Sequence, residues 1–246
     1  MRKKERAKDP EVMDSVYREA RAGASLNHTS INHIYSFDEF EGHPYLVMEL
    51  ADAGSLDSWI ERDQRVPELN VLDAGIGVTL ALNKALQHNL LHRDIKPGNI
   101  LYNDESEPKL IDFGLARKAE AENTDETSVW GTPYYVAPEK IRREAETFLS
   151  DMYSLGGTLY HALTGHVPFE APTIEDLVAA QVYTPLTPAT EVAPDITQKT
   201  SDAIGTGMAK DPRHRSPQYP DLHLALTLPP LQLPPQLHTH PHATAR

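Results

Sequence analysis

The sequence predicts an α+β fold, because short strand-like runs are confined to its first half and helical patterns dominate beyond Pro138. The chain has 246 residues, which is long enough to bury a sizeable core. Hydrophobic residues make up 39% and charged residues 24%, as is typical of a globular protein. The absence of cysteine excludes disulfides, thiolate zinc sites and cysteine nucleophiles.

The chain is acidic, with 23 Lys and Arg against 36 Asp and Glu and a formal net charge of −13. Binding to a nucleic-acid backbone requires clustered basic side chains, so we expect no nucleic-acid partner. No apolar run is long enough for a membrane-spanning helix, and the charged N-terminus precedes no apolar signal segment. We therefore expect no membrane span in this chain and a cytoplasmic location.

The first part of the chain predicts a helix followed by a hairpin. Apolar residues recur every four positions over 10–26, which is typical of a helix. Strand-like runs lie near 34–37 and at 45–49, and the segment between them contains glycine and proline, which favours a hairpin. Ser55 follows a turn and is expected to cap a short helix.

The middle of the chain alternates between helical and strand-like patterns. A helix with apolar periodicity is predicted over 67–88, although two glycines lower its helix propensity. Short strands are predicted at 100–102 and 109–111. A strongly apolar stretch at 152–163 predicts a buried helix.

Two segments are predicted to lack regular structure. The acidic segment 117–128 is expected to be a loop. Prolines are dense from Ser216 onward and are expected to break helices and strand pairing. We predict a disordered Pro- and His-rich tail over 229–246.

Polar side chains around the irregular segment 90–99 predict a phosphoryl-transfer site. Asp94 and Asn99 lie on this segment between apolar runs, and Asp112 follows the next predicted strand. Oxygen ligands with few carboxylates suit a Mg²⁺ ion that also binds substrate phosphates. Lys96 adds positive charge where phosphate charge would build up.

Several motifs resemble those of protein kinases, specifically the eukaryotic-like serine/threonine kinases of bacteria. They are His-Arg-Asp with its Asn at 92–99, Asp-Phe-Gly at 112–114, and the segment at 131–139 that ends in Ala-Pro-Glu. The resemblance covers about residues 7–226.

This resemblance implies a two-lobe kinase-like fold. The small β lobe over 1–50 would be truncated to helix C and strands 4 and 5. The mainly helical large lobe over 51–228 would carry the catalytic and activation loops.

The resemblance also implies a role for each matching residue. Asp94 would orient the substrate hydroxyl and accept its proton, and Lys96 would neutralise the transferred phosphoryl group. Asn99 and Asp112 would hold Mg²⁺. ATP is the implied phosphoryl donor, and Ser or Thr hydroxyls of proteins are the implied acceptors. The implied nucleotide-binding residues are Glu19 on the regulatory helix, Met48 behind the adenine, Glu49 to Ala51 in the hinge, and Leu101 below the base.

Other matching residues are expected to support the site. Asp151 resembles the buried aspartate of the central helix, and Arg215 is expected to pair with Glu139. A phosphate on the activation loop would pair with Arg93. The candidate phosphorylation sites are Thr124, Thr127 and Ser128. The remaining structural residues are His92, Phe113, Gly114 and Thr132.

The sequence departs from the family pattern at its front, where neither the Gly-rich loop nor the strand with the Val-Ala-Ile-Lys motif occurs. Lys3 and Lys4 lie in a charged run, so neither is assigned that role. We expect the polypeptide as written to transfer phosphate poorly, and a late start codon or a fragment would explain the departure. Two alternatives are a pseudokinase or scaffold and a small-molecule phosphotransferase of the aminoglycoside-kinase type.

Overall fold

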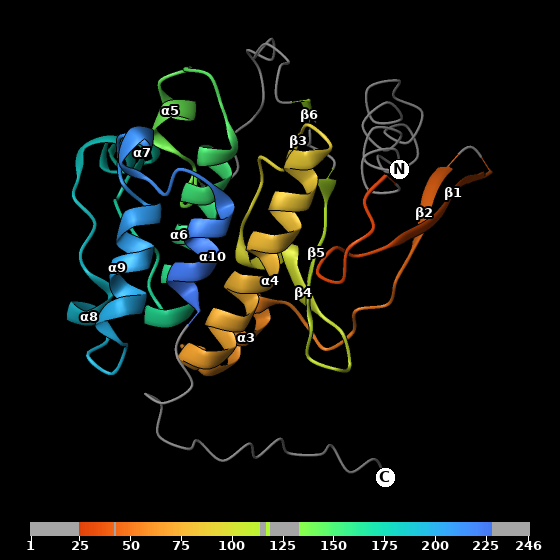
Figure 1. The fold of residues 1–246 in the computed structure, drawn as a ribbon, viewed down its shortest axis with the longest axis horizontal. Helices are drawn as coiled ribbons and strands as arrows, with labels where there is room; N and C mark the ends of the chain where they lie inside the picture. The colour runs from red at the N-terminus through yellow and green to blue at the C-terminus, as the bar shows by residue number, and fades with distance from the viewer. Residues whose placement is uncertain (1–24, 42, 114–116, 119–132, 228–246) are drawn as a thin grey trace.

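The computed structural model describes residues 25–41, 43–113, 117–118 and 133–227. The strands lie within residues 34–118, with two helices between them, and the described chain beyond Pro138 is mainly helical, which confirms the predicted α+β class (Figure 1). Residues 10–24 of the first predicted helix and the predicted tail over 229–246 lie outside these ranges.

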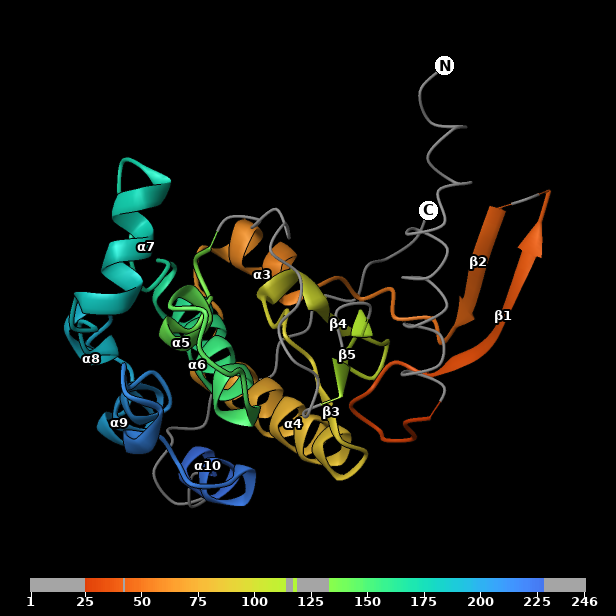
Figure 2. The same cartoon turned by 90° about the horizontal axis from the view of Figure 1, so that it is seen from above.

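A hairpin of β1 (Ile34–Phe40) and β2 (His43–Met48) confirms the first predicted strand pair. The strands pair antiparallel, with an irregular register between Ile34 and Ser36. Both views show the hairpin extending away from the helical body (Figure 2). The observed strands are therefore longer at the hairpin turn than the sequence pattern predicts.

The base of the hairpin is attached to the body through Leu110. Its amide donates to the Ser30 carbonyl at 2.9 Å, and its carbonyl accepts from the Asn32 amide at 3.0 Å. These bonds fix the segment that leads into β1 against the sheet that carries the candidate site.

The first two helices of the body begin where the sequence predicts. Ser55 caps α3 (Leu56–Asp63) with both bonds of a capping box. α4 (Glu68–Gln87) confirms the helix predicted over 67–88. Gly77 is required where α4 meets the sheet, because a Cβ there would lie 2.8 Å from Pro108. The glycine that lowers helix propensity thus allows close packing.

Two small antiparallel sheets frame the irregular segment. β3 (Leu90–Leu91) pairs with β6 (Arg117–Lys118), and β4 (Ile100–Tyr102) pairs with β5 (Pro108–Leu110). A short 3-10 turn, Pro97–Asn99, precedes β4. The expectation of a loop from residue 117 is wrong for its first two residues, because they pair with β3.

The rest of the described chain is mainly helical. Its helices are α5 (Pro138–Ile141), α6 (Phe148–Thr164), α7 (Ile174–Tyr183), α8 (Ala189–Val192), α9 (Gln198–Gly207) and α10 (Tyr219–Leu226). The expectation that prolines from Ser216 onward break helices is wrong for α10. Pro220 occupies the first turn of α10, where a helix needs no amide hydrogen bond.

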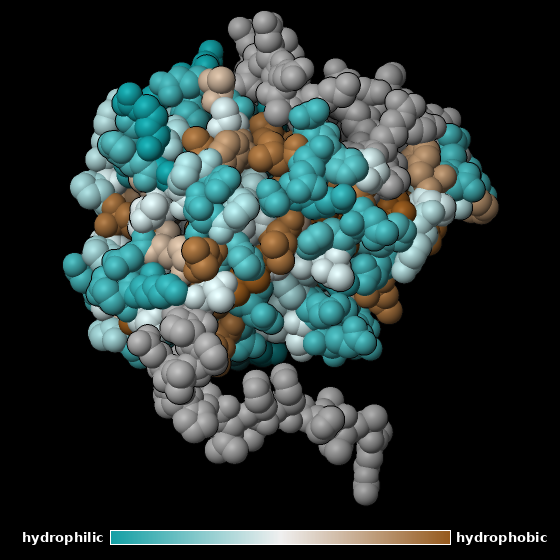
Figure 3. Space-filling view, viewed as in Figure 1, coloured by the Kyte–Doolittle hydropathy of each residue, from teal (hydrophilic) through white to brown (hydrophobic). Residues whose placement is uncertain are grey.

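The hydrophobic core includes most of α6, which is almost completely buried and packs against α3, α4, α8 and α9, while α10 packs on α4 and α9. The surface over these helices is mostly polar with separate apolar residues between them (Figure 3). None of the helices in the described ranges has the length and apolar character needed to cross a bilayer. The core therefore fixes α6 as a rigid support for the loop described next.

Candidate active site

A buried carboxylate on α6 holds the segment between β3 and β4. Asp151 accepts hydrogen bonds from the amides of His92 at 2.8 Å and Arg93 at 2.7 Å. Burial raises the pKa of Asp151, although the charge of His92 and both amide bonds act in the opposite direction. Arg93 adopts φ 70°, a left-handed conformation that is strained for a residue with a Cβ. The two bonds to Asp151 hold this conformation and so direct Asp94.

Asp94, Lys96 and Asn99 form one hydrogen-bonded group. Lys96 Nζ lies 2.6 Å from Asp94 Oδ2. The Asn99 amide nitrogen donates to the Asp94 carbonyl at 2.7 Å and to Asp94 Oδ2 at 3.1 Å. Asn99 is 6% exposed, whereas the side chains of Asp94 and Lys96 are 28% and 44% exposed. A fixed buried amide thus orients a carboxylate that faces solvent.

The pairing of β4 with β5 brings Asp112 next to this group. The amide of Ile111 donates to the Asn99 carbonyl at 3.0 Å, so Asp112 follows directly after that contact. Asp112 is exposed and adopts φ 65°, so it is a second non-glycine residue in the left-handed conformation at this site. The His92 ring hydrogen-bonds the Ile111 carbonyl at 2.9 Å and packs edge-on against Phe113 at 4.8 Å. The structure therefore places the three predicted oxygen donors at one end of the two small sheets.

The donor set at this end suits a hard cation bound together with substrate oxygens. Because the nitrogen of the Asn99 amide donates to Asp94, its Oδ1 is the atom that can ligate a metal. Asp112 supplies a single carboxylate. Across the described ranges no group of three or more His, Asp or Glu side chains forms a metal site of its own. One carboxylate and one amide leave coordination positions for phosphate and water, as Mg²⁺ requires.

A cavity of about 220 Å³ lies beside Asp112. Met48, assigned to the back of the adenine pocket, forms part of its wall and is 41% exposed. Leu101 is half-buried on β4 and forms an isolated antiparallel β-bridge with Ser55. Ala51, four residues before Ser55, is also half-buried. The structure therefore brings Met48 to the cavity but does not place Leu101 or Ala51 in its wall.

Glu49 joins the end of the hairpin to β5 through an ion pair that the sequence analysis missed. Its carboxylate lies 2.9 Å from Lys109 Nζ and accepts from the His33 amide at 3.2 Å. Burial opposes ionisation, but these hydrogen bonds lower the pKa of Glu49. The Lys109 side chain is only 7% exposed. A lysine within an otherwise apolar strand was the signal that could have identified it.

Glu139 and Arg215 form the predicted pair. Two parallel bonds of 2.7 and 2.8 Å join them, and their side chains are 3% and 0% exposed. Burial opposes ionisation of Glu139, but the guanidinium of Arg215 holds its pKa below the ordinary value. Lys140, which was not singled out, donates to the Arg93 carbonyl at 3.4 Å and so connects α5 with the catalytic segment.

Several predicted site residues lie outside the described ranges. The chain is described again from Pro133, and the buried Gln181 on α7 donates to the carbonyls of Pro133 and Tyr134. This contact fixes the point where the 131–139 motif meets the body. The site residues without described positions are Glu19, Gly114, Thr124, Thr127, Ser128 and Thr132.

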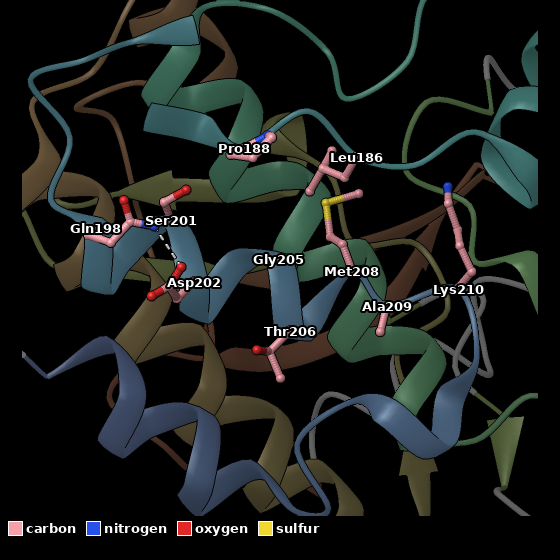
Figure 4. A pocket seen from close by; sticks show the side chains of 10 residues that line it. All are labelled: Leu186, Pro188, Gln198, Ser201, Asp202, Gly205, Thr206, Met208, Ala209 and Lys210. Atoms are coloured by element: carbon pink, nitrogen blue, oxygen red, sulfur yellow. Dashed lines mark hydrogen bonds between the residues drawn. The ribbon is translucent and has the colours of Figure 1, made fainter. Parts of the chain in front are cut away.

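A second cavity, of about 550 Å³, lies beside α9 and is lined by residues including Leu186, Thr206 and Met208 (Figure 4). None of the predicted site residues contributes to its wall. Its location does not connect it with the phosphoryl-transfer group.

Comparisons with known proteins agree with the motifs. A family model described as protein kinase domain matches residues 1–219. The chain is 33% identical over 216 residues to serine/threonine-protein kinase PknB of Mycolicibacterium smegmatis, covering 85% of this chain and 35% of that protein. It is 32% identical over 210 residues to serine/threonine-protein kinase PrkC of Bacillus subtilis, covering 85% and 32%.

The chain covers a larger share of a third relative. The chain is 33% identical over 213 residues to serine/threonine-protein kinase PknL of Mycobacterium tuberculosis, which covers 85% of this chain and 53% of that protein. In each case the chain spans little more than half of the relative's length, or less.

Proposed function

The chain belongs to the protein kinase domain family, and we propose that it transfers the γ-phosphoryl group of MgATP to Ser or Thr hydroxyls of proteins. The observation that carries this proposal is the hydrogen-bonded group formed by Asp94, Lys96 and Asn99. The buried Asp151 holds the main chain that leads into this group, and Asp112 lies next to it. In this class of reaction, rate depends mainly on positioning and electrostatics. A rigid polar group on a buried support meets that requirement.

Each residue has a defined part in the proposed reaction. Asp94 orients the acceptor hydroxyl and takes its proton as the oxygen forms a bond to the γ-phosphorus. The bond from that phosphorus to the bridging oxygen breaks, and ADP leaves with the electron pair. Lys96 supplies positive charge beside the transferred group. Asn99 Oδ1 and Asp112 would hold Mg²⁺, which when bound neutralises charge on the phosphates.

We also propose the nucleotide contacts and the division into lobes. The hinge would run from Glu49 to Ala51, with Met48 behind the adenine and Leu101 below it. Residues 1–50 would form the small lobe and 51–228 the large one.

Activation-loop phosphorylation at Thr124, Thr127 or Ser128 is a further part of the proposal. In the described ranges, the buried Nε of Arg93 has no hydrogen-bond partner. This supports the proposal that a phosphate oxygen accepts its hydrogen bond. Phosphosite mapping after incubation with MgATP tests it, and an unmodified 117–132 peptide in active protein would contradict it.

The central experiment measures transfer of label from γ-labelled ATP to a general acceptor protein in the presence of Mg²⁺. Asp94→Asn should reduce Ser and Thr labelling by about a hundredfold or more, because it removes the proton acceptor. Asp104→Asn is the matched control, since Asp104 is an exposed turn residue outside the site. Equal labelling by the wild type and Asp94→Asn would contradict the proposal.

The same assay separates the alternatives. Binding of MgATP without labelling that depends on Asp94 would favour a pseudokinase or scaffold. Labelling of an aminoglycoside in place of protein would favour a small-molecule phosphotransferase.

A further inference from the structure

Asn32 places a polar side chain in the wall of the cavity beside Asp112. It is 6% exposed and lies in the short segment that leads into β1. The wall around it is otherwise mostly apolar and consists of Ile34, Met48, Leu110, Ile111, Asp112 and Phe113. The cavity therefore connects the proposed metal-binding carboxylate with a buried amide that the kinase motifs leave without a role.

The orientation of the Asn32 amide is fixed by its surroundings. Its nitrogen donates to the Glu49 carbonyl at 3.3 Å, and its main-chain amide donates to Leu110 at 3.0 Å. Turning the side-chain amide over would bring its oxygen against the Glu49 carbonyl oxygen. The nitrogen therefore keeps its hydrogen bond to the Glu49 carbonyl, and Oδ1 points away from that carbonyl.

Asn32 Oδ1 is buried and has no hydrogen-bond partner in the described part of the chain. A buried acceptor without a donor is unfavourable and rare, so such an atom indicates a bound group that supplies the donor. Because the atom is a neutral oxygen, the missing group is an N–H or O–H rather than an anion.

We propose that Asn32 is a specificity-determining residue of the nucleotide site, where Oδ1 accepts a hydrogen bond from the exocyclic amine of adenine. The inference rests on the proposed function, which places a purine nucleotide against the hinge at Glu49. Met48 is unbranched and 41% exposed, so it can rotate to admit the amino edge of the base. A guanine base would instead bring its carbonyl oxygen against the acceptors of Asn32 and Glu49.

The test compares binding of ATP with binding of purine riboside triphosphate, which lacks the 6-amino group. Isothermal titration calorimetry on the full chain with Mg²⁺ gives the ratio of the two dissociation constants. Asn32→Leu should shift this ratio about five- to tenfold toward the analogue, as expected for one neutral hydrogen bond. Asn32→Ala should shift the ratio in the same direction, because it also removes the acceptor oxygen.

Asn103→Leu is the matched control, because Asn103 is also 6% exposed but lies outside this cavity. Its ratio should equal that of the wild type. The wild-type ratio in either folded Asn32 variant would overturn the inference and leave the proposed function intact. Failure of the wild-type chain to bind either nucleotide would overturn both. The two Asn32 variants change the core differently, so one folded variant suffices.

Discussion

Replacing Arg215 by methionine should destabilise the protein far more than removing a surface charge. The guanidinium makes two bonds to Glu139 and donates to the carbonyls of Leu149 and Ala209, each at 2.8 Å. Methionine fills a similar space but supplies none of these donors. Among the described residues, the buried carboxylate would keep the Ser150 hydroxyl alone as a side-chain partner.

The size of the effect follows from burial. Both side chains of the pair are at most 3% exposed, so the remaining charge of Glu139 cannot be solvated. Breaking such a pair by removing one partner costs about 3–5 kcal/mol. The double variant Glu139→Leu with Arg215→Met should recover much of this loss, because it leaves no unpaired charge.

Urea unfolding followed by far-UV circular dichroism measures the free energy of unfolding. The pair lowers the pKa of Glu139, so its contribution is present above the unfolded value of about 4.3 and is lost as the pH falls through the folded value. The difference between wild type and Arg215→Met should therefore shrink in acid.

Arg213→Met is the matched control for this prediction. Arg213 pairs with Asp211 at 2.6 Å, but its side chain is 86% exposed, so its removal should change stability very little. The reasoning is refuted if Arg215→Met costs no more than Arg213→Met, or if the double variant is as unstable as the single one.

Four further substitutions test other parts of the structure by the same unfolding assay. Gly165→Ala should lower the free energy of unfolding by more than about 1 kcal/mol, because Gly165 has φ 76° and a Cβ would clash with the Gln64 carbonyl. Gly205→Ala should instead raise it by about 0.5–1 kcal/mol, because Gly205 lies within α9 and a Cβ there would meet no other atom. Burial lowers the pKa of His161, so stability should fall as the pH drops below about 6.5, and His161→Gln should flatten this dependence. Asp151→Asn should lower the free energy of unfolding by at least about 2 kcal/mol and reduce phosphoryl transfer. The main-chain amides of His92 and Arg93 donate to different oxygens of Asp151, and asparagine keeps only one of these oxygens. An unchanged unfolding curve would contradict this prediction.

Periodicity and turn chemistry predicted the elements whose local preferences agree with their packing. The helix over 67–88 and the Ser55 cap are examples, since both follow from local pattern alone. The helix at 219–226 was not predicted, because proline density is a poor guide when one proline falls in the first helical turn. The strand at 117–118 was missed because its partner among the described residues, β3, is distant in sequence.

The candidate site could be predicted where motifs carry chemistry, as for Asp94, Asn99 and Asp112. The left-handed conformations of Arg93 and Asp112 could not, because neither residue is a glycine and the strain is held by contacts distant in sequence. Asn32 is recognised only by burial, since a single asparagine in a mainly polar segment is unremarkable in a sequence. Its unpaired oxygen is a property of the packed structure.

The attachment of the hairpin determines where it bends. One strand leaves the body at Asn32, whose amide is bound to Leu110, and the other returns at Glu49, which is paired with Lys109. Since both ends are fixed to β5, we expect displacement of the hairpin to be smallest at these two attachments. The amplitude should then grow with distance from these two attachments, so the far end of the hairpin moves most and Ile34 and Met48 in the cavity wall move least.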